Sequence, residues 1–310
     1  MWYNPAPSVD GIYFFETFSP PESYQRKNVQ DLESIVMKSA CLILAGIFTL
    51  SLPLFAQEAT KQEATDALKA FKTSLKTVQA ESDIIDALNT LGEVQHDKVL
   101  GELKKWLLGN GSTVKKVAMK EIRSGGMATT REEVQAALNA SIRNVRFAAA
   151  ENISKYKEDK KAADALIGAV RAAKNDPETQ EKFIECATLT EYNKIDKKVC
   201  ALFNDRNVGV ARSAVYGTTN LKTKVCISEL IKLVKGLEGI SEDSTGAGAP
   251  PMPGPGGVGG GQENEQLKRK RALLPTANQA LKDITGERYN TGRDWSLWWR
   301  KNASKYTEPE

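Results

Sequence analysis

One amphipathic pattern recurs along this chain and is clearest in Val145-Arg-Phe-Ala-Ala-Ala-Glu-Asn-Ile153. Related segments begin at Val114, Thr179 and Val210, and the segment at Thr179 is the most divergent. The start positions 114, 145, 179 and 210 are separated by steps of 31, 34 and 31 residues, a spacing typical of stacked helical repeats. Each segment follows a polar turn and an earlier amphipathic helix. The sequence therefore predicts an all-α fold, a right-handed α-solenoid (superhelix) of about six antiparallel helix pairs.

Apolar residues recur at helical steps of three and four throughout residues 61–238. Thr130 followed by Glu133 has the form of a capping box, and Ser141 is the expected cap of the Val145 helix. Asp176-Pro177 has the residue types of an N-cap and a first helical position. The expected helices span residues 64–78, 84–91, 99–108, 114–122, 134–138, 145–153, 161–174, 177–189, 195–203, 208–216 and 225–237.

The second helices of these pairs resemble those of HEAT repeats. Val145-Arg-Phe-Ala-Ala-Ala150 matches the family's "V-R-x-A-A-A" pattern well, and Asp or Asn turns such as Asn175-Asp176 accompany it. Val210-Ala-Arg-Ser-Ala214 matches in part, with its arginine displaced, and Thr179–Ala187 departs most. The resemblance implies a stack of helix pairs whose second helices line a concave surface. HEAT arrays serve many partners, so it does not name one.

Composition limits the chemistry that the chain can perform. The sequence has one histidine, four cysteines and a net charge of +4, and it lacks a CxxC pair, a P-loop and a nucleophile elbow. We therefore expect no catalytic residues, no metal and no cofactor. His96 is expected on a helix surface, and Cys186, Cys200 and Cys226 are expected as buried apolar residues, with a Cys186–Cys200 disulfide as the alternative.

The N-terminal part resembles a secretory signal. Met37-Lys-Ser-Ala-Cys41 precedes an apolar run, Leu42–Ala56, and polar sequence starts at Gln57. We predict a mis-assigned or disordered extension at 1–36 and a signal peptide at 37–56, which places the protein in the periplasm or outside the cell. Two explanations remain open: a start codon assigned too far upstream, or an uncleaved membrane anchor behind a genuine N-terminal tail.

The C-terminal part has three features. The predicted repeat region, 57–240, ends at a Gly/Pro-rich segment, 241–263, which is expected to be a flexible insertion within the last helix pair or a linker. Residues 264–310 are expected to form a long helix, bent or restarted at Pro275 and stopped by Gly286, and then a cap. The ending resembles the tail of some exported bacterial HEAT-repeat proteins. The expected cap residues are Tyr289, Trp295, Trp298 and Trp299.

Two sets of basic residues are candidates for binding. On the second helices, a basic stripe would attract an acidic partner, or its arginines would bond a neighbouring turn instead. The run in the long helix would contact an anionic polymer or lipid headgroups, or would form a solvated face. The stripe comprises Lys115, Lys116, Arg143, Arg146 and Arg212, and the run comprises Lys268, Arg269, Lys270 and Arg271.

These observations predict a non-catalytic exported scaffold that holds a protein or peptide on its concave face. One alternative is a HEAT protein that binds nucleic acid or another anionic polymer, although export and the mild charge argue against it. Another is a lyase-like module associated with an enzyme. Beyond the signal, no segment is long and apolar enough to span a membrane, and the oligomeric state is left open.

Overall fold

A computed structural model of the chain describes residues 59–109, 111–125, 130–240 and 265–306. Every regular element in these ranges is a helix, which confirms the predicted all-α class. The predicted extension at 1–36, the signal at 37–56 and the Gly/Pro segment at 241–263 lie outside the described residues. The α-helices are α2 (Lys61–Thr77), α3 (Glu81–Gly92), α4 (Asp97–Leu107), α5 (Gly111–Gly125), α6 (Arg131–Ser154), α7 (Lys160–Ala172), α8 (Pro177–Leu189), α9 (Asp196–Cys200), α10 (Val208–Leu221), α11 (Lys224–Glu238), α12 (Glu265–Thr285) and α13 (Gly292–Asn302).

Several helix ends fall where the sequence predicts them. Thr130 and Glu133 form the reciprocal capping box at the start of α6. The Asp176 side chain accepts a hydrogen bond from the Thr179 N–H, and Pro177 opens α8. Gly286 ends α12 with a φ of 76°, a left-handed conformation that glycine adopts without steric cost. The helix starts predicted at Thr130 and at Asp176-Pro177, and the helix end predicted at Gly286, are therefore confirmed.

The predicted break before Val145 is wrong. Residues 131–154 form one continuous helix, α6, and Ser141 lies in its interior instead of capping a second helix. The sequence from 131 to 154 contains no glycine or proline, so nothing forces the backbone out of the helix. The side chain of Asn139, near the predicted break, accepts a hydrogen bond from the side chain of Gln135 one helical turn earlier.

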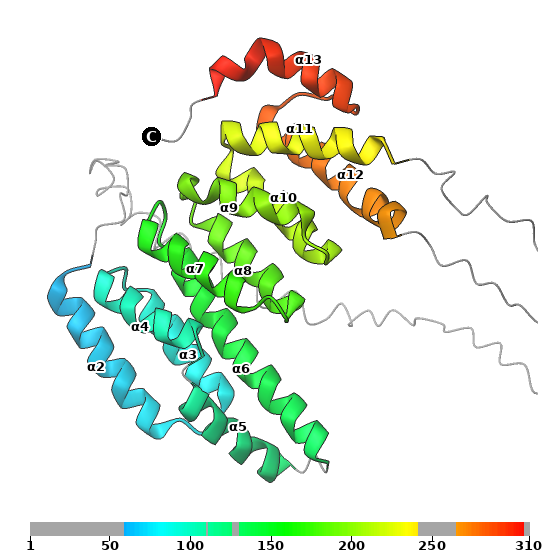
Figure 1. Cartoon of the computed structure of the whole chain (residues 1–310). Helices are drawn as coiled ribbons and strands as arrows, with labels where there is room; N and C mark the ends of the chain where they lie inside the picture. The colour runs from blue at the N-terminus through cyan, green and yellow to red at the C-terminus, as the bar shows by residue number, and fades with distance from the viewer. Residues whose placement is uncertain (1–58, 110, 126–129, 241–264, 307–310) are drawn as a thin grey trace, which may run out of the picture. The chain divides into compact units, whose positions relative to one another are not determined.

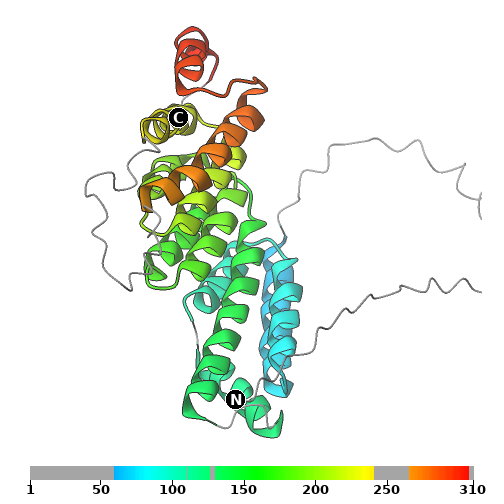
Figure 2. The ribbon, with the colours of Figure 1, turned by 90° about the vertical axis from the view of Figure 1, so that its right-hand side faces the viewer.

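The helices pack in two neighbouring rows. In one row, α3, α6, α8, α10 and α12 each contact the next member. Helices α2, α4, α7, α9 and α11 pack against this row, and Figure 1 shows α7 beside α8 and α11 beside α12. Figure 2 shows α13 (red) next to α11 (yellow), which it contacts. The apolar faces of both rows meet in a continuous buried core.

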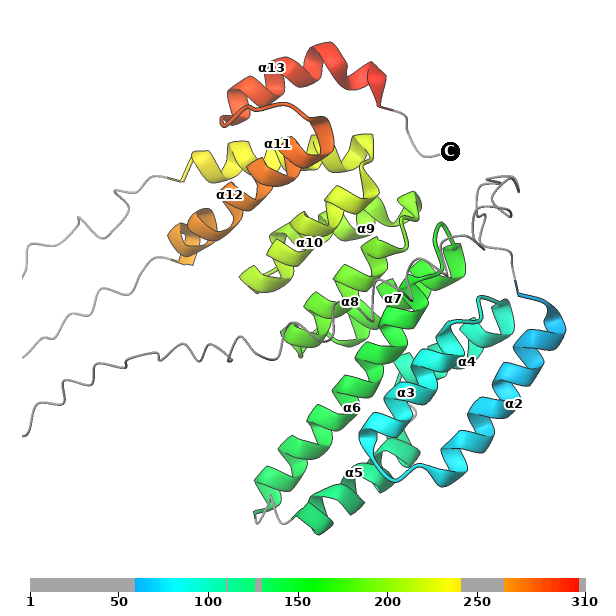
Figure 3. The same cartoon turned by 180° about the vertical axis from the view of Figure 1, so that it is seen from behind.

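The pairing around α5 differs from the prediction. The sequence pairs residues 99–108 with 114–122, but α4 packs mainly against α6, and α5 packs against α6 and α3. Figures 1 and 3 show α5 beside the N-terminal end of α6. The 31-residue step from Val114 to Val145 is therefore not a step between equivalent helices of one row.

Two further elements depart from expectation. Residues 195–203 do not form one regular helix, because the five-residue α9 is flanked by two 3-10 turns, Asn193–Ile195 and Ala201–Asn204. Helix α12 runs through Pro275 without a restart. Pro275 is exposed, so the carbonyl group that loses its N–H partner one turn earlier lies near solvent.

Candidate functional site

A groove of about 600 Å³ lies over α6, α8 and α10. We call it the α8 groove, because α8 contributes its centre. It lies on the row that contains the Val145 and Val210 segments, where the sequence places the binding surface. Its lining residues are Phe147, Glu178, Glu181, Lys182, Glu185, Thr188, Leu189, Ser213, Tyr216, Gly217, Thr219 and Asn220.

Close contact between α8 and α10 forms the floor of this groove. A Cβ atom on Gly217 would lie 2.5 Å from Cγ2 of Thr188, which is closer than packed atoms approach each other. Thr188 is fully buried, and its hydroxyl donates to the Glu185 carbonyl at 3.0 Å. Because Gly217 has no side chain, α10 can pack close enough to α8 for the two helices to form one continuous groove floor.

The lining of the groove is acidic. Glu178, Glu181 and Glu185 outnumber the single cation, Lys182. The Lys182 ammonium bonds Glu151 at 2.8 Å and Glu185 at 3.3 Å. Burial disfavours its charged form, but these carboxylates outweigh burial and raise its pKa. Lys182 therefore remains a cation that is already shared between two glutamates.

One carboxylate and one aromatic ring are available for a partner. Glu181 is half-buried, and a Cβ atom on Gly209 in the first turn of α10 would lie 2.0 Å from its Oε1. Among the described residues Glu181 makes no ion pair or side-chain hydrogen bond. Tyr216 is 55% exposed, which is high for so large an apolar side chain. Glu181 and Tyr216 line the same groove, and a carboxylate and an aromatic face each attract positive charge, so the groove suits a cationic side chain.

The predicted basic stripe does not form a continuous surface. Arg143 pairs with Glu178 and, at 3.6 Å, with Asp176. Arg146 donates from Nε to the Leu107 carbonyl at 2.9 Å, and its guanidinium lies 5.0 Å from the centre of the Phe183 ring. Both arginines therefore bond neighbouring turns and rings within the chain, which was the alternative to a partner surface.

The other three members of the stripe lie on two other helices, α5 and α10. Lys115 and Lys116 are exposed on α5 and line a separate hollow with Met119 and Arg123. Arg212 is exposed on α10. The five residues are thus spread over three helices that do not share one groove.

The basic run in α12 divides into two kinds of residue. Arg269 donates to the carbonyl oxygens of Phe203 and Asp205, and Lys270 donates to the Ile240 carbonyl at 2.7 Å. These bonds satisfy carbonyl groups at the ends of preceding helices. Lys268 and Arg271 are exposed. Only half of the run is therefore presented to solvent.

The aromatic residues near the C-terminus pack together. Trp295 is fully buried, and its Nε1 donates to the Asn278 side chain at 2.8 Å. Tyr289 and Trp298 contact Trp295 edge to face, with ring centres 5.2 and 5.9 Å away. Trp299 is half-buried. These positions suit the structural role that the sequence predicts.

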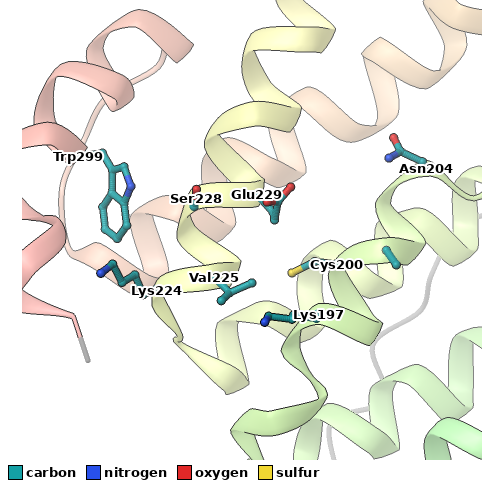
Figure 4. A pocket seen from close by; sticks show the side chains of 9 residues that line it. Lys197, Cys200, Asn204, Lys224, Val225, Ser228, Glu229 and Trp299 are labelled. Carbon is teal, nitrogen blue, oxygen red and sulfur yellow. The ribbon is translucent and has the colours of Figure 1, made fainter. Parts of the chain in front are cut away.

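A second groove, of about 530 Å³, lies between α9, α11 and α13. Figure 4 shows Cys200, Lys197 and Trp299 among its lining residues. Cys200 Sγ lies 3.6 Å from Cys226 Sγ, and Cys186 is a separate buried free thiol. The sulfur facing Cys200 therefore belongs to Cys226, not to Cys186 as the predicted alternative has it.

His96 also differs from its predicted surface role. It is the N-cap of α4 and is half-buried, and its Nδ1 accepts a hydrogen bond from the Lys98 N–H at 3.0 Å.

Within the described ranges, no group of three or more His, Cys, Asp or Glu residues is arranged to hold a metal. In the same ranges, no helix combines the length and apolar character needed to cross a membrane.

Comparison of the chain with protein-family models, with curated proteins and with solved structures finds no match.

Sequence reasoning missed the acidic groove, although a signal for it exists. Glu178, Glu181 and Glu185 are spaced by three and four residues, which places them on one face of α8. Tyr216 had no comparable signal, because an aromatic residue at a helical step is usually buried.

Proposed function

We propose that this chain is a non-catalytic, HEAT-like α-solenoid that is exported to the periplasm or secreted and binds a protein or peptide partner. The α8 groove is the proposed site. The packing of the helices in two neighbouring rows supports the proposed solenoid. Solenoids of this kind present extended binding surfaces along one row of helices. The signal-like sequence at 37–56 supports export.

The single observation that carries the proposal is an acidic groove with an exposed tyrosine on the predicted binding row. A peptide that presents Lys or Arg fits this groove. Its cation would pair with Glu181 and its stem would pack against Tyr216, which is 55% exposed. An acidic partner, which the basic stripe favoured, fits less well because Arg143 and Arg146 already bond within the chain.

The test is a selection of peptides from a random display library on the full chain, followed by titration of the selected peptides. We expect the selected peptides to be rich in Lys and Arg. Glu181→Gln and Tyr216→Ala should each weaken binding by about 5- to 30-fold, equivalent to about 1–2 kcal/mol.

The matched control is Glu132→Gln, which removes an exposed carboxylate near the start of α6, away from the groove lining. Its affinity should equal that of the wild type. Selection of acidic peptides would contradict the proposal, and so would equal binding by Glu181→Gln, Tyr216→Ala and the wild type. Circular dichroism and thermal unfolding of each variant separate loss of binding from loss of fold.

A further inference from the structure

Two buried thiols face each other between α9 and α11. Cys200 is the last residue of α9, and Cys226 lies in the first turn of α11. Their sulfur atoms are 3.6 Å apart, although the residues are 26 positions apart in the sequence. Both thiols are buried, and both are free. Such a pair is more than two apolar residues that share a core, because the sulfurs touch.

The surrounding hydrogen bonds hold the two helices at this distance. The Thr223 hydroxyl donates to the Asp196 carboxylate at 3.0 Å and accepts from the Cys226 N–H at 3.2 Å. Asp196 opens α9 and Thr223 caps α11. A covalent S–S bond is about 2.05 Å long, so the sulfurs need to approach by only about 1.5 Å, within reach of small side-chain rotations.

The two thiols differ in their access to solvent. Cys200 lines the groove of Figure 4, whose floor and walls come from α9, α11 and α13. Cys226 is fully buried behind it. A reagent in the groove therefore meets the Cys200 sulfur first, and Cys226 reacts only with Cys200.

We propose that Cys200 and Cys226 form an intramolecular disulfide by exchange with a small disulfide such as oxidised glutathione. The Cys200 thiolate attacks one sulfur of the reagent, forms a mixed disulfide and releases one glutathione thiolate, which takes up the proton that Cys200 lost. The Cys226 thiolate then attacks the Cys200 sulfur and releases the second glutathione, which takes up the proton from Cys226. The protein loses two electrons and two protons, and one oxidised glutathione becomes two reduced molecules.

The electrostatic setting favours Cys226 in the second step. The S–H of Cys200 donates to Cys226, and this hydrogen bond lowers the pKa of Cys226. The N-terminal turn of α11 also favours a thiolate at this position. The hydrogen bond to Cys226 and burial raise the pKa of Cys200, and burial raises the pKa of Cys186 to about 12, so access to solvent and not pKa distinguishes these two thiols. Cys200 lines the groove of Figure 4, whereas Cys186 is fully buried and lines neither of the two grooves.

The disulfide would join α9 directly to α11, on which α13 packs. An exported protein meets an oxidising compartment, where such a bond persists. The geometry itself is independent of the peptide-binding proposal, and failure of either proposal leaves the other unaffected.

The test uses the full chain with Cys41→Ser, so that only the three described cysteines remain. The protein is incubated with excess oxidised glutathione, blocked with N-ethylmaleimide, digested and analysed by mass spectrometry. We expect a linked pair of peptides containing Cys200 and Cys226. Oxidation should raise the melting temperature by about 5–10 °C, since the bond closes a loop of intermediate length.

Variants assign the bond to this pair. Cys186→Ala should keep both the linked peptides and the rise in melting temperature, whereas Cys200→Ala and Cys226→Ala should lose both. The same reaction is repeated during refolding from urea, so that burial cannot protect the thiols. Cys200 and Cys226 that remain open to alkylation after oxidative refolding would overturn the proposal. A link from Cys186 to either residue would overturn it as well. If a variant fails to fold, the linked peptides of the Cys41→Ser protein decide the test by themselves.

Discussion

Arg146 contacts three helices through one side chain. It lies on α6, bonds the carbonyl of Leu107, the last residue of α4, and stacks on Phe183 of α8. Burial lowers its pKa, and nearby Asp176 raises it in part, so the group remains charged at neutral pH. A half-buried guanidinium held in this way is a packing element.

The first prediction compares this arginine with the exposed arginine of the Val210 segment. Arg146→Ala removes a charge-assisted hydrogen bond and the ring contact, and should lower the free energy of unfolding by about 2–4 kcal/mol. Arg212→Ala should change it by less than about 0.5 kcal/mol, because Arg212 is exposed. Urea unfolding of both variants gives the comparison. Equal effects would mean that the contacts of Arg146 add nothing to stability.

At the scale of the element, α6 shows how residue type and context interact. All of its buried residues lie from Val145 onward, so its first half has no fully buried side chain. The capping box at Thr130 starts this half, and the core holds the second half. The helix is continuous because no glycine or proline lies between residues 131 and 154.

The second prediction distinguishes a helix interior from a cap at Ser141. In the interior of a helix, Ser141→Ala improves helix propensity and should raise the free energy of unfolding by up to about 0.5 kcal/mol. At an N-cap, the same change would lower it by about 1 kcal/mol. Thr130→Ala is the positive control, because Thr130 does cap α6. Urea unfolding decides the sign, and destabilisation by Ser141→Ala would restore the two-helix interpretation.

The sequence predicts helix positions better than helix partners. Caps and glycine stops act within a few residues, so Thr130, Asp176 and Gly286 could be assigned from the sequence. Packing partners depend on which buried faces meet. The 31-residue step from Val114 to Val145 fits a repeat, but it also fits the observed arrangement, in which α5 packs against α6 and α3. The acidic face of α8 could have been found from its own spacing. The Cys200–Cys226 contact could not, because it arises from the packing of α9 against α11.

At the scale of the whole described body, α13 lies against α11 and covers part of its surface. Trp295 is the anchor, since it is fully buried and hydrogen-bonded to Asn278 of α12. In addition, the Glu238 carboxylate at the end of α11 accepts from the Gly292 N–H at 2.9 Å. Helix α13 is therefore held to α12 through Trp295 and to α11 through Gly292.

The last prediction follows from these contacts. Trp295→Ala should lower the free energy of unfolding by about 3–5 kcal/mol, because it leaves a large cavity and an unpaired Asn278. Leu297→Ala is the control on the same helix, since Leu297 is 46% exposed and should change stability by less than about 0.5 kcal/mol. In a repeat stack each element is stabilised chiefly by its neighbours. Hydrogen exchange should therefore accelerate first in α11–α13 of Trp295→Ala, while α3 and α6 keep their protection. Uniform acceleration in every helix would show instead that the described body unfolds as one cooperative unit, and the proposed solenoid character would fail with it.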